Sequence, residues 1–259
     1  MVAMTRYLLV VMLLLLLIAV NTVAVSIDPG MGAAYTAVGS GPLAPLWNAA
    51  GALGSPGVHG AFAVTLSSSD EPTLLVGASI AAQNSPTVCW SMYKQASARE
   101  TWGTFAFPVF TGTTAGLGVA YASGTKSGIS FHAGVLYSGA QWALGGSVMH
   151  IASGLFGGGL PIEFQAGAAI FAIPGATLAA NVFLSEDAIL LTIGGEAMIW
   201  LIDMRWGLSI IPTGGIDRLG MGIGFNLFSI PIDLALGVSG TSFQPYGSIG
   251  ISANIPAWW

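Results

Sequence analysis

The feature that most constrains the fold of this chain is a repeated alternation, in which large apolar residues occupy every second position and mostly small residues lie between them. In LGMGIGFNLF, the residues Met221, Ile223 and Phe225 share one parity, whereas glycines and an asparagine occupy the other. The same pattern recurs in DMRWGLSI (203–210), in TAGLGVAYAS (114–123) and in GSIGISANI near the end. Because successive side chains of a strand point to opposite faces, these segments are strands with one large apolar face and one small face.

The identity of the small residues indicates which face of each strand points inward and which points outward. A soluble sandwich would carry Lys, Glu, Arg and Thr on its outer parity, but only 7% of this chain is charged, against about a quarter in soluble domains. A Gly, Ala, Ser and Asn face instead suits the inner wall of a barrel whose outer face touches lipid. Since only helices and closed barrels satisfy every backbone group in a bilayer, we predict an all-β, transmembrane antiparallel β-barrel.

Charged residues punctuate the alternating runs as turn signals: Asp70 and Glu71, Arg99 and Glu100, Lys126, Glu186 and Asp187, Asp217 and Arg218. With these boundaries we predict fourteen strands, an even number as in bacterial single-chain barrels, at 58–67, 73–82, 86–96, 101–110, 114–123, 127–137, 141–151, 161–172, 175–184, 187–198, 200–211, 217–227, 229–239 and 244–255. Aromatic residues near the run ends are predicted to form interfacial girdles: Trp90, Trp102, Tyr137, Trp142, Trp200 and Tyr246.

Residues 1–26 have the layout of a secretory signal peptide. Arg6 precedes an apolar run from Leu8 to Val20, and small residues precede a cleavage site after Ser26, or alternatively after Ala24. The competing interpretation is a retained membrane anchor, but the run falls short of the roughly 20 residues that a spanning helix needs. We therefore expect export and residence in the cell outer membrane of a Gram-negative-type envelope, in contact with outer-membrane lipid.

Between this leader and the first strand lies GAAYTAVGSGPLAPLWNAAGALG (32–54). The segment resembles the start of the FadL-type and PorV/PorQ-like outer-membrane barrels, whose members begin with a GMGGAxxA motif and continue with a turn similar to ALYWNPAGLA. The matching residues are Gly30, Met31, Gly32, Ala33, Ala34 and Ala37, then Leu46, Trp47, Asn48, Ala50, Gly51 and Leu53. Ala49 replaces the family's proline, and Gly39-Ser40 replaces its frequent acidic pair. A later hairpin ending in Gly195-Glu196 extends the resemblance over most of the mature chain.

The resemblance implies a fourteen-stranded barrel (57–259) with an N-terminal hatch (27–56) folded inside or across the lumen. Leu46, Trp47, Asn48 and Leu53 are the expected hatch residues. The alternative is a disordered leader, which would leave large apolar side chains in water at about 1.5–3 kcal/mol each. The final Trp258 and Trp259 resemble the signature that the outer-membrane assembly machinery reads, which makes that machinery an expected partner.

Charged residues on the inward parity are the candidate lumen site: Glu163, Glu196, Asp203, Arg205 and Asp233. Asp203 and Arg205 lie two apart on one face, so they can pair or engage neighbouring strands. One interpretation is a structural network that braces the wall, and the other is a patch that binds a ligand head group. FadL-type relatives carry hydrophobic compounds, and a lumen without rings of charge is compatible with a small hydrophobic ligand.

Other classes of function lack their sequence signals. The formal charge of −5 provides no basic surface for nucleic acid, and Cys89 is the single cysteine. The three histidines (His59, His132, His150) fall on different predicted strands, no nucleophile elbow is present, and residues 154–161 lack the Lys-Ser/Thr end of a phosphate loop. We therefore predict no catalytic residues, no metal site and no cofactor.

Two functions remain open. The first is passive uptake of small hydrophobic molecules through a plugged lumen. The second is a non-transporting scaffold that anchors or hands over surface proteins, as PorV-like relatives do. A scaffold needs long ordered surface loops, whereas the boundaries above leave mostly short ones, which favours transport.

Overall fold

The computed structural model describes residues 36–53, 56–68, 71–82, 85–124, 127–156, 159–186, 188–228, 230–240 and 242–256. Residues 1–26 and the terminal Trp258 and Trp259 lie outside this range. Fourteen strands follow one another: β1 Gly57–Ser67, β2 Thr73–Ala81, β3 Thr87–Gln95, β4 Ala98–Phe110, β5 Thr113–Ser123, β6 Gly128–Ser138, β7 Trp142–Ile151, β8 Glu163–Ile173, β9 Ala176–Leu184, β10 Ile189–Ile199, β11 Ile202–Ile211, β12 Gly215–Leu227, β13 Ile230–Ser239 and β14 Gln244–Pro256. Short 3-10 helices are η2 (Ala44–Leu46), η3 (Ala49–Ala52) and η4 (Ser153–Phe156).

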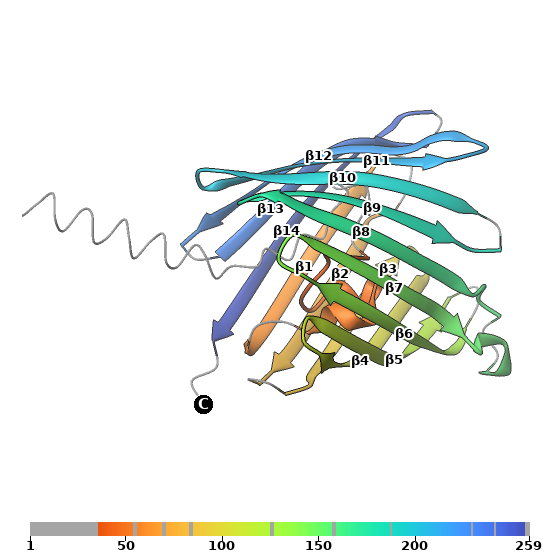
Figure 1. Ribbon diagram of the computed structural model, residues 1–259. Helices are drawn as coiled ribbons and strands as arrows, with labels where there is room; N and C mark the ends of the chain where they lie inside the picture. The colour runs from red at the N-terminus through yellow and green to blue at the C-terminus, as the bar shows by residue number, and fades with distance from the viewer. Residues whose placement is uncertain are drawn as a thin grey trace, which may run out of the picture.

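The strands form one closed barrel in which each pairs with its sequence neighbours (Figure 1). The seam between β1 and β14 is antiparallel and runs from the pair Gly57 and Pro256 to the pair Ser67 and Tyr246. Closure leaves no strand edge unpaired, as a bilayer requires. The predicted strand number and closure are confirmed. No helix within the described part of the chain is long and apolar enough to span a membrane.

The largest boundary differences have local causes. Strand β4 begins at Ala98, three residues before the predicted start, because Ala96 adopts a left-handed conformation (φ 52°) that closes a tight turn. Glu100 therefore lies inside a strand and not in a turn. Strand β11 begins two residues later than predicted, because Trp200 (φ 63°) and Leu201 form the preceding turn.

The two faces of the strands separate as the alternation predicts. Met221 and Ile223 are 65% and 42% exposed on the outer surface, whereas Gly222 and Gly224 are buried on the inner wall. An outer surface of large apolar side chains is suited to lipid. The girdle prediction was wrong for Trp102 and Tyr246: both side chains are buried, and both line a cavity inside the barrel.

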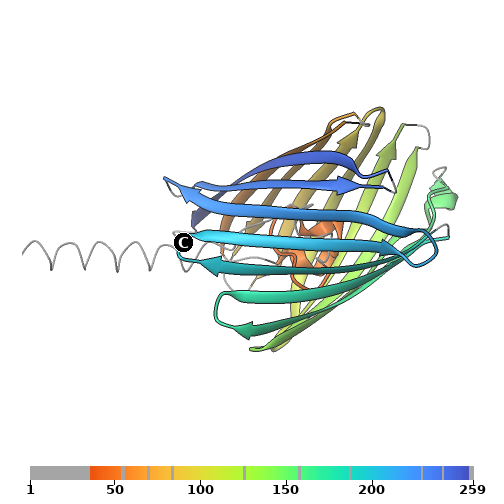
Figure 2. The same cartoon turned by 90° about the horizontal axis from the view of Figure 1, so that it is seen from above.

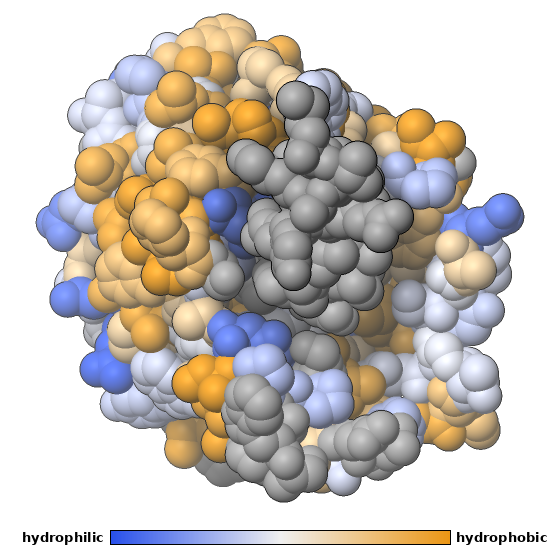
Figure 3. All heavy atoms as spheres, turned by 90° about the vertical axis from the view of Figure 1, so that its left-hand side faces the viewer, coloured by the Kyte–Doolittle hydropathy of each residue, from blue (hydrophilic) through white to orange (hydrophobic). Residues whose placement is uncertain are grey.

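The barrel end at which β1 begins and β14 ends, called here the terminus end, has two apolar turns. Trp200 and Phe228 are 92% and 91% exposed at the tips of two turns, each in a left-handed conformation. Groups of hydrophobic side chains lie on the rim at this end and alternate with hydrophilic ones (Figure 3). Aromatic rings favour the headgroup level of a membrane, so these tips suit an interfacial position. The opposite end is called the distal end.

Residues 36–53, the lumenal segment, lie within the barrel (Figure 2). Helix η3 contacts β4, β5 and β6, and η2 contacts β3 and β4. Leu43 is fully buried and packs with Ala61, Ala63 and Leu75 of the wall. Each buried apolar cluster among the described residues therefore includes or contacts part of this segment.

Placing a charge on the outer face should be costly. Ile223 lies well inside β12, and we expect Ile223→Arg to lower the free energy of unfolding by about 2–4 kcal/mol, the cost of Arg near the bilayer midplane. The matched control is Leu227→Arg at the end of the same face, where about 0–1 kcal/mol is expected. Denaturant unfolding in lipid vesicles measures both, and equal effects at the two positions would contradict the lipid-facing orientation.

Candidate functional site

Asn48 organises the lumenal segment from its centre. It is the N-cap of η3, where its Oδ1 accepts a hydrogen bond from the Ala50 N–H at 3.0 Å. Its Nδ2 donates to the carbonyl oxygens of Thr36 at 2.9 Å and of Val135 on β6 at 3.0 Å. One buried amide thus caps the helix and joins it to both the preceding chain and the barrel wall.

The wall lacks side chains where the segment touches it. A methyl group on Gly116 would overlap the backbone of Ala49, and one on Gly134 would overlap the Asn48 amide. At Gly145 it would overlap the Thr36 carbonyl. The small parity of β5 to β7 therefore allows one backbone to lie directly against another.

Polar contacts complete this attachment. Ser147 Oγ donates to the Trp47 carbonyl at 2.6 Å, and Thr36 Oγ1 donates to Gln165 Oε1 at 3.0 Å. Cys89 Sγ lies 3.2 Å from the Pro42 carbonyl oxygen. These contacts come from β3, β7 and β8, so several strands hold the segment in place.

A cavity of about 390 Å³ opens above the lumenal segment and is called here the vestibule. It lies toward the distal end, because its lining includes the last residues of β1, β3 and β13. Its apolar lining consists of Leu46, Trp47, Leu75, Tyr93, Trp102, Met149 and Tyr246. Its polar lining consists of Thr65, Ser67, Glu71, Thr73, Gln95, Glu100, His150, Glu163, Arg218 and Ser239. Leu46 and Trp47 are half-buried because they face this cavity.

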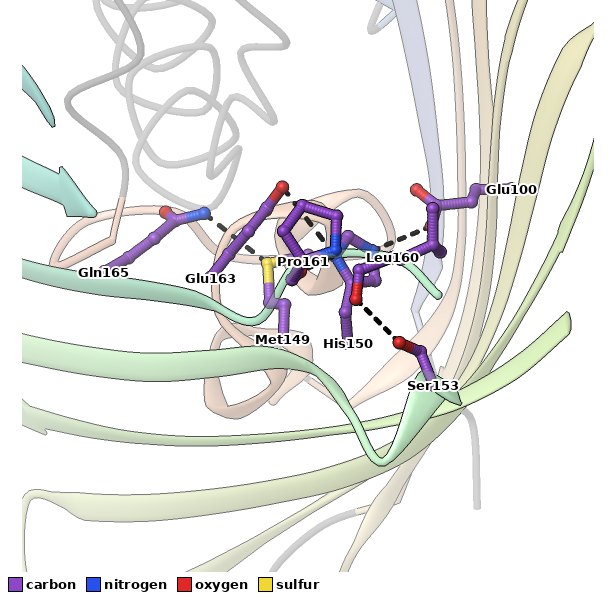
Figure 4. Close-up of polar contacts among 8 residues, drawn as sticks. All are labelled: Glu100, Met149, His150, Ser153, Leu160, Pro161, Glu163 and Gln165. Carbon is purple, nitrogen blue, oxygen red and sulfur yellow. Dashed lines mark hydrogen bonds and ion pairs between the residues drawn. The ribbon is translucent and has the colours of Figure 1, made fainter. Parts of the chain in front are cut away.

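His150 connects two carboxylates on one side of the vestibule (Figure 4). Its Nε2 lies 2.8 Å from Glu100 Oε1, and its Nδ1 lies 3.2 Å from the Pro161 carbonyl and 3.7 Å from Glu163 Oε1. Both ring nitrogens face acceptors, so the protonated ring satisfies both contacts. The backbone of His150 is left-handed (φ 58°), which turns the chain at the end of β7.

A second charged group surrounds Arg205 on the opposite half of the wall. Arg205 Nε donates to Glu196 Oε2 at 2.7 Å, Nη1 donates to Asp233, and Asp203 Oδ2 lies 3.7 Å from Nη2. These residues are near the terminus end of β10, β11 and β13. The structure therefore divides the predicted lumen residues: Glu163 faces the vestibule, and the other four form this network, in which Arg205 and Asp233 are buried.

The sequence did not identify Glu100, His150 or Trp102 as site residues. Glu100 and Trp102 share the inward parity of β4, but large residues occupy both faces of this strand. The contact of His150 with Glu100 joins strands that are not neighbours in the sheet. Among the described residues, no group of three or more His, Cys, Asp or Glu side chains is arranged to hold a metal ion.

Comparisons with solved structures give the same architecture. The structure described as the CymD monoaromatic hydrocarbon channel matches with a TM-score of 0.66 at 10% identity, over 88% of this chain and 96% of that one. A mutant of the Rh. blastica porin matches with a TM-score of 0.50 at 10% identity, over 77% and 99%. No protein-family model matches the sequence, and no curated protein does. The fold is thus that of outer-membrane channel barrels.

Removing the cation of the Arg205 network should destabilise the barrel. In Arg205→Met, the buried Asp233 carboxylate and that of Glu196 lose their partner, and we expect a loss of about 3 kcal/mol in the free energy of unfolding. The double variant Arg205→Met with Asp233→Leu removes both buried charges and should recover at least half of that loss. Urea unfolding measures the free energy of unfolding of both variants. If Arg205→Met is as stable as the wild type, the charged network does not stabilise the wall.

Proposed function

We propose that this chain is an outer-membrane channel for passive uptake of small hydrophobic molecules. The observation that carries the proposal is the vestibule, which is polar at its mouth and apolar at its floor, and which rests on the lumenal segment. A solute entering from the distal end would move from charged side chains to a floor formed by Leu46, Trp47 and Trp102. Transfer of apolar surface out of water favours this step by about 25 cal/mol for each Å².

The lumenal segment would act as the hatch below this cavity. It contacts the wall through Asn48 and a few other polar groups and through Leu43, and much of its remaining contact is between small residues such as Ala52 and Ala106. Small-residue contacts contribute less burial than large ones. The strands of the barrel pair with one another and not with this segment, so its displacement would leave the closed sheet intact, which suits an element that moves to admit cargo.

The comparison with CymD supports this choice of cargo. That protein is described as a channel for monoaromatic hydrocarbons, and its barrel shares the fold of this chain. We assign residues 1–26 as a signal peptide that directs export, and the outer-membrane assembly machinery as the partner that inserts the barrel. Residues 27–56 form the hatch domain and residues 57–259 the barrel domain in this proposal.

The scaffold alternative finds less support in the connections between strands. At the distal end, β3 and β4 are joined by residues 96–97, and the longest connection is 152–162 between β7 and β8. Ser153 Oγ donates to the Leu160 carbonyl at 2.6 Å and thereby joins the two ends of that connection to each other (Figure 4). Such short connections offer little surface to a partner protein.

Deleting residues 41–53 tests whether the segment gates the lumen. We expect the deleted chain, reconstituted in lipid vesicles, to admit a small apolar dye several times faster than the full chain. The barrel should still assemble, because no strand is removed. Dye entry into vesicles measures the rate, and the heat-induced shift in gel mobility reports assembly.

The control is Phe62→Ala, which shortens an exposed outer side chain of β1 and should leave the rate unchanged. If the deletion lowers only the heat stability and leaves dye entry at the rate of the full chain, the segment is a filler. The gated-uptake proposal then fails.

A further inference from the structure

Buried polar atoms without partners gather on one part of the inner wall. On β2, β3, β4 and β6, five side-chain atoms have no hydrogen-bond partner among the described residues: Ser79 Oγ, Thr87 Oγ1, Ser91 Oγ, Trp102 Nε1 and His132 Nδ1. All five residues are more than nine-tenths buried. Outside this part of the wall, the described residues include two further such atoms, Asn181 Oδ1 on β9 and Arg218 Nε on β12. Each buried polar atom that is left unpaired costs free energy.

These atoms form a track from the vestibule toward the terminus end. Glu100, Trp102 and Thr104 succeed one another on the inward parity of β4, beginning at its distal end. Ser91 is the cross-strand partner of Trp102, and Thr87 is the partner of Ala106 further along. The track thus begins in the cavity and continues along the wall contacted by the lumenal segment.

Trp102 is its entry point. The indole is 3% exposed, lines the vestibule and packs with Met149, Leu46 and Tyr93. Its Nε1–H can only donate, so the missing partner is an acceptor. Glu100 lies two residues away on the same face, and its carboxylate can accept from a hydroxyl group while still binding His150.

These contacts define the chemistry of a fitting ligand. A pure hydrocarbon would leave the Trp102 donor unpaired, and an ammonium group has no lone pair to accept from it. A carboxylate ligand would be repelled by Glu71, Glu100 and Glu163. The cationic groups in the cavity are Arg218 and the imidazole of His150, which two of these carboxylates already share. A neutral hydroxyl or carbonyl oxygen on an aromatic ring satisfies the donor and uses the aromatic lining.

Resting on the proposed uptake function, we propose that the vestibule selects small aromatic molecules that carry a neutral oxygen, and that Trp102 is the specificity-determining residue. The test compares four probes that share one skeleton: benzyl alcohol, toluene, benzylamine and benzoate. Isothermal titration calorimetry of the full chain in lipid nanodiscs measures their affinities, with empty nanodiscs correcting for partition into lipid. The wild type should bind benzyl alcohol at least fivefold more tightly than each of the other three.

The variant Trp102→Phe keeps an aromatic ring and removes the donor. It should weaken benzyl alcohol binding about fivefold to tenfold, the factor that one hydrogen bond contributes, and leave toluene binding unchanged. Trp142→Phe is the matched control, because Trp142 lies on the outer surface beside Tyr137; it should bind both probes as the wild type does. A purely structural role of Trp102 would change both affinities by the same factor.

Equal affinity of the wild type for toluene and benzyl alcohol would overturn the selectivity and leave the uptake proposal standing. This comparison uses only the wild type, so it tests the selectivity even if Trp102→Phe does not fold. An equal loss of both affinities in Trp102→Phe would also overturn it. If none of the four probes binds, the vestibule is not a ligand site, and the uptake proposal loses the observation that carries it.

Discussion

Backbone-to-backbone contact between the lumenal segment and the barrel wall is the interaction on which the interior depends. It exists because Gly116 and Gly145 carry no side chain where the backbones of Ala49 and Thr36 approach, and Gly134 likewise leaves room for the Asn48 side-chain amide. Interiors are packed closely enough that one added methyl group must displace something. These wall glycines are therefore needed so that the lumenal segment can fit inside the barrel.

The vestibule follows from this arrangement. The 3-10 helices of the segment lie against β3 to β6, Leu43 packs against β1 and β2, and polar contacts reach β7 and β8 through Ser147 and Gln165. Its Leu46 and Trp47 then face the distal opening. The Arg205 network holds β10, β11 and β13 together on the other side. The lumenal segment thus packs against the first nine strands, whereas β10, β11 and β13 are joined by their own charged side chains.

The alternation in the sequence was sufficient to predict the barrel, because Gly and Ala on one parity exclude a water-facing surface. It also placed Arg205 and its neighbours on the inner wall. It failed on β4, where Trp102 and Phe105 occupy opposite faces and size does not identify the inward one. The contact between His150 and Glu100 depends on curvature that brings non-neighbouring strands together, and a period of two carries no information about curvature.

The position of the seam has a consequence for biogenesis. The lumenal segment precedes β1 in the chain. Because β1 pairs with β14, the wall closes only when the first and last strands meet, at pairs such as Gly57 and Pro256. The contacts of the segment with β3, β7 and β8 join residues 47, 100 and 129 positions apart, so they close shorter loops than the seam and are entropically less costly to form. The segment can therefore contact the wall before the seam closes.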